Sequence, residues 1–109
     1  MKERAYFKQI IVIAIMASLS CLPALCEAEK DYLKSGIKAY NKGDYQEAIG
    51  QLGLARANEF NNAKLHYYLA NAYVQTGKNS DAVREFRIAF ALDPESDVGK
   101  FSKQALQYM

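Results

Sequence analysis

Apolar residues between positions 63 and 94 recur at three- and four-residue spacings in two runs, with a few polar residues between the runs. The first run predicts a helix over roughly 63–76, which Gly77 ends. The second predicts a helix that begins near Asn79 or Ser80, either of which can cap it, and ends at Asp93-Pro94. Because the connection is short, we expect the two helices to pack antiparallel. The apolar stripes are formed by Leu65, Leu69, Ala72 and Tyr73, and by Ala82, Val83, Phe86, Ala89 and Phe90.

The segment 63–96 resembles the tetratricopeptide repeat, a helix–turn–helix unit with a period of about 34 residues. The residues that carry the resemblance are His66, Leu69, Ala70, Tyr73, Gly77, Ala82, Phe86, Ala89 and Pro94. Ala70 and Ala82 are expected at the crossing of the two helices, where small side chains let the backbones approach. The resemblance implies an all-α fold and a role in protein–protein recognition.

The preceding segment, 29–62, is a weaker copy of the same pattern. Its matching residues are Tyr32, Gly36, Gly43, Ala48, Leu52 and Ala55. Asp44 and Glu47 have the spacing of a capping box. The segment departs from the family pattern at Ser35, at the shifted aromatic Tyr40 and at Phe60, which stands where proline would end the repeat. We therefore expect looser packing in this helix pair.

Two glycines, Gly50 and Gly53, fall inside the second predicted helix of this weaker copy. Each costs about 1 kcal/mol relative to alanine in a helix interior. Either they let another helix approach closely, or the helix is a weak one at the surface.

Residues 97–109 predict a capping helix. Ser96 is a suitable N-cap, and Val98, Phe101 and Ala105 recur at helical spacing among polar residues. We expect antiparallel helix–turn–helix repeats at 29–62 and 63–96, then the cap, with about five helices after the leader. Solenoids generally need about three repeats to bury a continuous core, so self-association or docking on a larger partner is also expected.

The N-terminal segment, 1–28, predicts a secretory signal peptide. Lys2, Arg4 and Lys8 precede a stretch from 9 to 26 without charge, whose most apolar part, 10–22, is short for a membrane span. Cleavage after Ala28 or after Cys26 would fit, and the surroundings of the cysteines suit lipidation poorly. We expect an extracytoplasmic protein, in a bacterial periplasm or secreted. The alternative is an uncleaved membrane anchor that still leaves the following domain outside the cytoplasm.

Charge excludes one class of partner for the domain after the leader. Residues 1–28 hold three of the 14 basic residues and two of the 12 acidic ones, so the rest of the chain is nearly neutral. Nucleic-acid-binding domains are normally strongly basic, and we expect no nucleic-acid partner. Both cysteines lie in the leader, so helix packing must stabilise the mature domain without disulfides.

Four lysines, Lys30, Lys34, Lys38 and Lys42, stand at every fourth position along the first predicted helix. Like charges at this spacing disfavour a helix by a few tenths of a kcal/mol per pair. The row either meets an anionic surface, such as lipid head groups or an acidic protein, or is a solvated face softened by Glu29 and Asp31.

Residues suited to catalysis or to cofactor binding are scarce. His66 is the only histidine and stands where the family usually has tryptophan, which favours a packing role. The mature sequence has neither cysteine nor a His/Asp/Glu group at metal-ligand spacing, and it has no glycine-rich phosphate loop. We expect no enzyme activity, no metal and no cofactor.

The resemblance implies a concave groove lined by the first helix of each repeat. The residues placed there are Leu33, Ile37, Tyr40, Asn41, Tyr67, Asn71, Val74 and Gln75. Such an apolar and aromatic groove fits an extended apolar peptide or an amphipathic helix. A clamp for a terminal carboxylate is not supported, because Leu33 and Ile37 stand where lysine and asparagine would be needed. The capping helix is the alternative occupant, notably over Tyr67 and Val74.

Two functions follow as hypotheses. In the first, the protein is a non-catalytic adaptor that binds a peptide or helix of an envelope or secretion component, and changes at Tyr67 and Asn71 abolish capture. In the second, it is a scaffold that associates with itself through its repeat ends, and changes at Phe101 and Leu106 alter the oligomeric state. The membrane enters either hypothesis only through an uncleaved leader.

Overall fold

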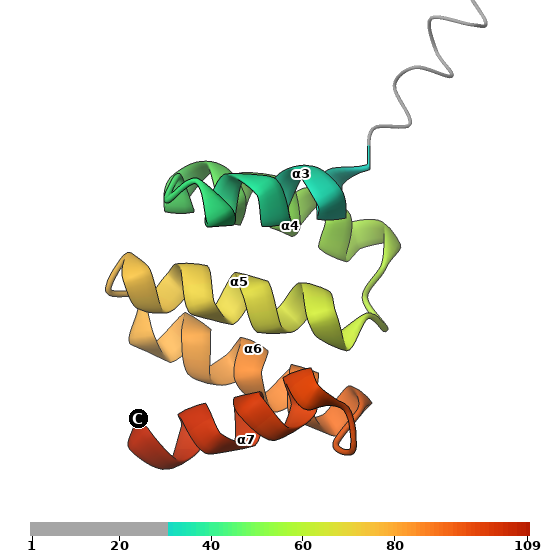
Figure 1. Ribbon diagram of the computed structural model, residues 1–109, viewed down its shortest axis with the longest axis vertical. Helices are drawn as coiled ribbons and strands as arrows, with labels where there is room; N and C mark the ends of the chain where they lie inside the picture. Colours follow the sequence, from blue (N-terminus) through green and yellow to red (C-terminus); the bar gives the residue numbers. More distant parts are fainter. Residues whose placement is uncertain (1–30) are drawn as a thin grey trace, which may run out of the picture. The chain divides into compact units, whose positions relative to one another are not determined.

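The computed structural model describes residues 31–109, and the predicted signal peptide lies outside the described residues. The described part forms five helices: α3 (Tyr32–Asn41), α4 (Tyr45–Asn58), α5 (Ala63–Gln75), α6 (Asn79–Leu92) and α7 (Asp97–Tyr108). Successive helices run in opposite directions and pack against one another, as Figure 1 shows. The predicted all-α fold of antiparallel helices is confirmed. Within residues 31–109, no helix is both long and apolar enough to cross a membrane.

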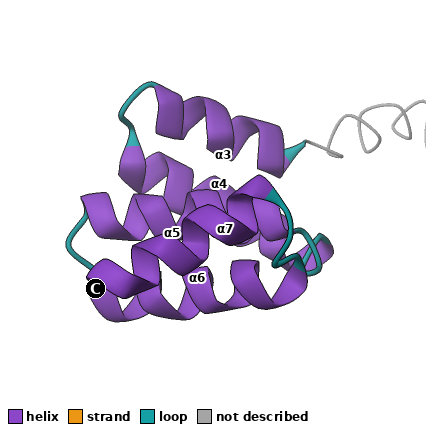
Figure 2. Cartoon of the chain, turned by 60° about the horizontal axis from the view of Figure 1, so that its bottom comes forward, coloured by secondary structure: helices purple, strands orange, loops and turns teal. Residues whose placement is uncertain are grey.

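The core consists of two clusters that share α5. In the first, Ala39, Leu52 and Leu69 join α3, α4 and α5. In the second, Ala70 and Phe86 join α5 to α6, and Ala105 and Leu106 of α7 pack against them. Figure 2 shows α7 lying over α5 and α6, in agreement with its contacts to both helices. The position of α5 between the clusters makes it the central element of the described chain.

Helix crossings use the small residues that the sequence pattern indicated. Ala70 and Ala82 are fully buried where α5 meets α6. At the crossing of α3 and α4 the corresponding residue is Gly36, where a Cβ would lie 2.5 Å from Cγ of Leu52. That distance is shorter than real Cβ contacts allow, so α3 and α4 approach more closely than an alanine would permit.

The same glycine turn ends the first helix of both helix pairs. Gly43 and Gly77 have φ angles of 85° and 77°, in the left-handed region that glycine adopts without a steric penalty. The next amides, of Asp44 and Lys78, donate back to Ala39 O at 3.0 Å and Tyr73 O at 2.9 Å. These bonds form a Schellman motif, which explains why each helix ends there.

Two of the predicted helix caps are wrong. The N-cap of α6 is Lys78 rather than Asn79 or Ser80, and Asp44, although it is the N-cap of α4, accepts no hydrogen bond from the helix. Both caps follow a glycine turn, and their ψ angles are 70° and 68°. The N-caps of α3, α5 and α7, whose side chains do accept hydrogen bonds from the helix, have ψ angles of 88°, 105° and 161°. Lys78 has no side-chain acceptor and cannot cap the amides, and Asp44 makes no cap bond in the backbone conformation that follows the glycine turn.

The predicted cap Ser96 is confirmed, because its Oγ accepts a hydrogen bond from Gly99 N at 3.1 Å. The same hydroxyl donates to Asp93 O at 2.8 Å. Gly50 and Gly53 of α4 lie in open space, since a Cβ at either position would meet no atom within 4 Å. No helix of the described chain approaches them closely.

Candidate functional site

Residues of the predicted groove that come from α3 lie mainly against the core. Leu33, Ile37 and Tyr40 are half-buried and pack on the cluster that joins α3, α4 and α5. The Tyr40 ring makes edge-to-face contacts with Tyr45 and Tyr68, with both centroid distances 5.4 Å. Burial and the neighbouring phenols raise the pKa of Tyr40, so its hydroxyl stays protonated at neutral pH. Asn41, at the end of α3, is exposed.

Residues of the predicted groove that come from α5 divide between two surroundings. Tyr67 and Asn71 are half-buried and linked, because Asn71 Nδ2 donates to Tyr67 O at 2.9 Å. The Tyr67 ring lies 6.3 Å from the Phe86 ring and 6.2 Å from the Phe101 ring, between centroids. Val74, at 37 % exposure, and Gln75 lie one turn further along, at the surface.

Helix α7 lies beside Tyr67 and Asn71 and forms with them a shallow cavity of about 280 Å³. The lining residues are Tyr67, Asn71, Phe86, Phe101, Gln104, Ala105 and Tyr108. A second, larger cavity of about 560 Å³ shares Tyr108 with the first and is lined by Val74, Asn79, Ser80, Val83, Tyr108 and Met109. We call these the α5–α7 cavity and the Val74 cavity.

The structure therefore brings Tyr67 and Asn71 together and places Val74 in the neighbouring cavity. None of the other predicted groove residues lines either cavity: Leu33, Ile37, Tyr40, Asn41 and Gln75. The contribution of Gln104, Ala105 and Tyr108 was not predicted, because α7 was interpreted as a cap. The helical spacing of Phe101, Ala105 and Tyr108 was the sequence signal that could have indicated this contribution of α7. No charged side chain lines either cavity.

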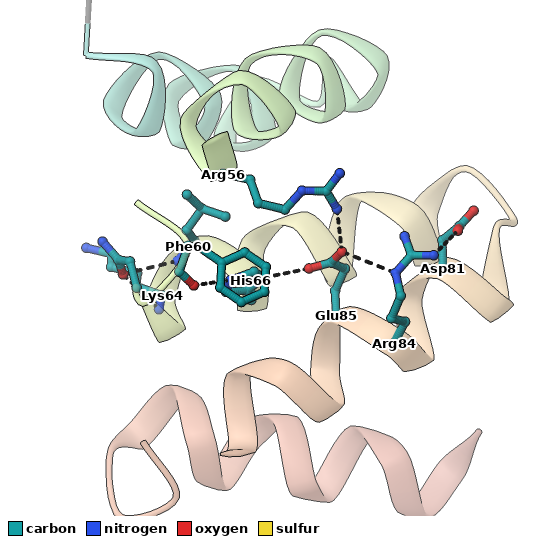
Figure 3. Close-up of polar contacts among 9 residues, drawn as sticks. Arg56, Phe60, Lys64, His66, Asp81, Arg84 and Glu85 are labelled. Atoms are coloured by element: carbon teal, nitrogen blue, oxygen red, sulfur yellow. Dashed lines mark hydrogen bonds and ion pairs between the residues drawn. The ribbon is translucent and has the colours of Figure 1, made fainter. Parts of the chain in front are cut away.

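A buried polar cluster lies on the other side of α5 (Figure 3). His66 Nδ1 is 2.6 Å from Glu85 Oε2, and His66 Nε2 is 2.6 Å from the carbonyl oxygen of Phe60. Arg56 donates to Glu85 Oε1 at 2.8 Å. Arg84 lies 3.5 Å from the same oxygen and 3.1 Å from Asp81. The side chains of His66 and Glu85 are fully buried.

The protonation state of the Glu85 carboxyl follows from the groups around it. Burial alone raises the pKa of the Glu85 carboxyl, but the hydrogen bond and charge of His66 and the charge of Arg56 outweigh it and hold the pKa below its usual value. Glu85 is therefore an anion and only accepts hydrogen bonds. Both His66 nitrogens therefore have a hydrogen-bond partner, Nδ1 in the Glu85 carboxylate and Nε2 in the carbonyl oxygen of Phe60.

The tetratricopeptide repeat family profile matches residues 63–96, the segment that contains α5 and α6. This segment is a tetratricopeptide repeat. The resemblance inferred from the sequence is thereby confirmed, and such repeats generally mediate protein–protein interaction without catalysis of their own. No match was found among curated proteins. For residues 29–62, assignment as a repeat stays a prediction, although α3 and α4 form the expected helix pair.

Within this repeat His66 makes hydrogen bonds through both ring nitrogens, in addition to the packing role that the sequence predicted. Both ring nitrogens have partners and the ring is inaccessible, so His66 is not placed to bind a metal or act as a base. Among residues 31–109 no group of His, Cys, Asp and Glu is arranged to hold a metal ion. Sequence reasoning missed Glu85, whose signal was an acid within the apolar stripe of α6, beside Phe86.

Proposed function

We propose that this protein is a non-catalytic adaptor that binds a peptide or helix of a partner protein along α5 and α7. The observation that carries the proposal is the α5–α7 cavity, which is uncharged, largely aromatic and open to solvent. Phe101 and Tyr108 remain 51 % and 83 % exposed at its edge. Large aromatic side chains that stay exposed in a folded domain are typical of protein-binding surfaces.

The lining favours a partner segment with an apolar side chain and an accessible backbone. Tyr67 and Phe101 offer ring surface to an inserted apolar side chain, and the buried Phe86 lies beneath them. Asn71 and Gln104 carry amides that both donate to and accept from a peptide backbone. An acidic side chain would lose its hydration in this cavity without meeting a positive charge. The groove along α3, which the family resemblance implied, extends the proposed surface through Asn41 and the exposed parts of Leu33, Ile37 and Tyr40.

The proposal places the adaptor outside the cytoplasm, in a bacterial periplasm or secreted, with a partner from the envelope or from secretion. This part rests on the sequence of residues 1–28, with its basic start and uncharged apolar stretch. Fractionation of cells, with the mass of the protein from each fraction, tests it. A chain of full mass in the cytoplasm would contradict export.

A second candidate function is a scaffold that assembles through its repeat ends. It is favoured by the exposed Phe101, Tyr108 and Met109 on the terminal helix, which a second copy would cover. Leu106 is a poor probe of such an interface, because it packs against the core cluster of Ala70, Ala82 and Phe86. Phe101 is the better probe, since half of its surface is exposed.

Crosslinking in intact cells tests the adaptor against the scaffold, with captured species identified by mass spectrometry. The variant Gln104→Glu adds a charge at the cavity, and Gln107→Glu adds the same charge to an exposed residue of α7 that lines neither cavity. The adaptor predicts a distinct captured protein that Gln104→Glu loses and Gln107→Glu retains. Capture of self-multimers alone, reduced by Phe101→Ser, would replace the adaptor with the scaffold.

A further inference from the structure

The lysines of α3 form a row on the face of the helix that points away from the rest of the described chain. Lys34, Lys38 and Lys42 are all exposed, whereas Gly36 and Ala39 are buried on the opposite side. Four residues correspond to slightly more than one helical turn, so the row extends about 12 Å along the helix. Lys30 continues the row in the sequence and lies outside the described residues.

No acidic side chain pairs with this row among the described residues. Every ion pair found in residues 31–109 uses arginine or histidine as the cation. Asp31 and Asp44 stand at the two ends of α3, where they are its N-cap and the N-cap of the next helix. Adjacent like charges slightly destabilise α3, and none of the three described lysines forms an ion pair with an acidic side chain of residues 31–109.

We propose that the lysine row of α3 rests on an anionic phospholipid surface. Two observations select this partner. First, the row carries only positive charge, which complements the phosphates of acidic lipids and attracts them when the surface is close. Second, the chain outside the structure ends directly before α3, and in it residues 9–26 carry no charge and include the apolar stretch 10–22, which stays in the membrane when the leader is left uncleaved. At about 3.5 Å per residue, an apolar segment held at a membrane keeps Lys34 within about 28 Å of the surface.

A lipid surface fits the row better than an acidic protein does. Protein interfaces usually contain a buried aromatic or large apolar anchor at their centre. The exposed large apolar side chains of the described chain are Leu54, Phe60, Val74, Phe101, Tyr108 and Met109, and none of them is on α3. Lipid head groups rearrange around isolated ammonium groups and require no complementary shape.

This orientation leaves the α5–α7 cavity of the proposed adaptor surface open. Helix α3 contacts α4 and α5 but not α7, and the two lie at opposite ends of the helix stack in Figure 1. A domain that rests on lipid through α3 therefore turns the α5–α7 cavity away from the surface. The inference does not depend on the adaptor proposal.

Residue-resolved acylation of lysine tests the inference on the full chain. The protein is mixed with vesicles of phosphatidylcholine alone or of phosphatidylcholine with phosphatidylglycerol, and each lysine is followed by mass spectrometry. We expect Lys34, Lys38 and Lys42 to react several-fold more slowly only where phosphatidylglycerol is present. The exposed lysines of other elements, Lys64, Lys78 and Lys100, should not change. Salt at 1 M, where the screening length is about 3 Å, should abolish the difference.

A pair of variants with equal charge change provides the control. Phosphatidylglycerol should increase the binding of the protein to vesicles. In the variant Lys34→Gln/Lys38→Gln/Lys42→Gln this increase should be about a hundredfold smaller, at about fivefold per lysine. Lys64→Gln/Lys78→Gln/Lys100→Gln should keep that increase. Equal losses in the two variants, uniform acylation, or equal protection on both vesicles would overturn the inference. Protection by an acidic envelope protein without lipid would replace lipid with protein as the partner.

Discussion

His66 Nδ1 lies 2.6 Å from Glu85 Oε2, and neither side chain is accessible to solvent. This pair joins α5 to α6, and it reaches the preceding helix pair through Arg56 on α4 and the carbonyl oxygen of Phe60. One buried carboxylate therefore connects the matched repeat to the helices before it. Because Glu85 is the shared acceptor of His66 and Arg56, removing its charge leaves both without their anionic partner.

Substitution of Glu85 by glutamine should lower the free energy of unfolding by about 3–5 kcal/mol, since His66 and Arg56 would lose their shared anion. Urea titration followed by circular dichroism measures the change. Asp81→Asn is the matched control, because its pair with Arg84 is exposed and should be worth about 0–1 kcal/mol. A loss no larger for Glu85 than for Asp81 would show that the cluster does not stabilise the fold.

Acid should weaken the protein through the same carboxylate. The pKa of Glu85 is lower in the folded protein than the ordinary 4.5, so the unfolded chain binds more protons as the pH falls. The stabilisation from Glu85 is complete above about pH 4.5 and is lost as the pH falls through the folded-state pKa. Urea titrations between neutral pH and pH 3 should show this loss, and Glu85→Gln should show less of it. An equal acid dependence in both proteins would contradict the assignment.

Gly36 and Gly50 should respond in opposite directions to alanine. A Cβ at position 36 would lie 2.5 Å from Cγ of the buried Leu52 and 3.1 Å from its backbone nitrogen, so Gly36→Ala should destabilise by about 1–3 kcal/mol. Gly50 lies in a helix interior with no atom within 4 Å of a Cβ. Gly50→Ala should therefore stabilise by about 1 kcal/mol, from helix propensity alone. Thermal unfolding of both variants checks the signs, and the same sign for both would refute the packing argument.

The helices and their order could be predicted because α5, α6 and α7 carry regular apolar stripes and because α3, α5 and α6 end at a glycine or a proline. Some local sequence signals have a single structural interpretation: glycine turns at Gly43 and Gly77, and the small residues Ala70 and Ala82 at a helix crossing. The cap of α4 could not be predicted from residue type, because Asp44 makes no cap bond in the backbone conformation that follows the glycine turn. Sequence spacing alone thus identifies a cap position without showing whether its side chain bonds.

The candidate site was predictable only in part, since contacts between elements decide it. Tyr67 and Asn71 were expected as neighbours on α5 and line one cavity, but the wall opposite them comes from α7. The distance between α7 and α5 depends on how closely the turn Asp93–Ser96 packs on α7. The Glu85 cluster was missed for the same reason, because His66 and Glu85 lie 19 residues apart on different helices.

Gly99 should control whether α7 can form its side of the cavity. A Cβ at this position would overlap the backbone carbonyl group of Asp93 and lie 3.0 Å from Cα of Pro94, and backbone atoms cannot move aside as a flexible side chain can. Gly99→Ala should therefore displace the start of α7, with a loss of about 1–3 kcal/mol or more.

Amide chemical shifts measure this displacement. In Gly99→Ala they should change at Phe101 and Gln104 on α7 and at Asn71 on α5, which line the cavity, while those of α3 stay fixed. Gln107→Ala, on the exposed side of α7, is the control and should leave the cavity shifts in place. Unchanged shifts around the cavity in Gly99→Ala would mean that the turn does not position α7.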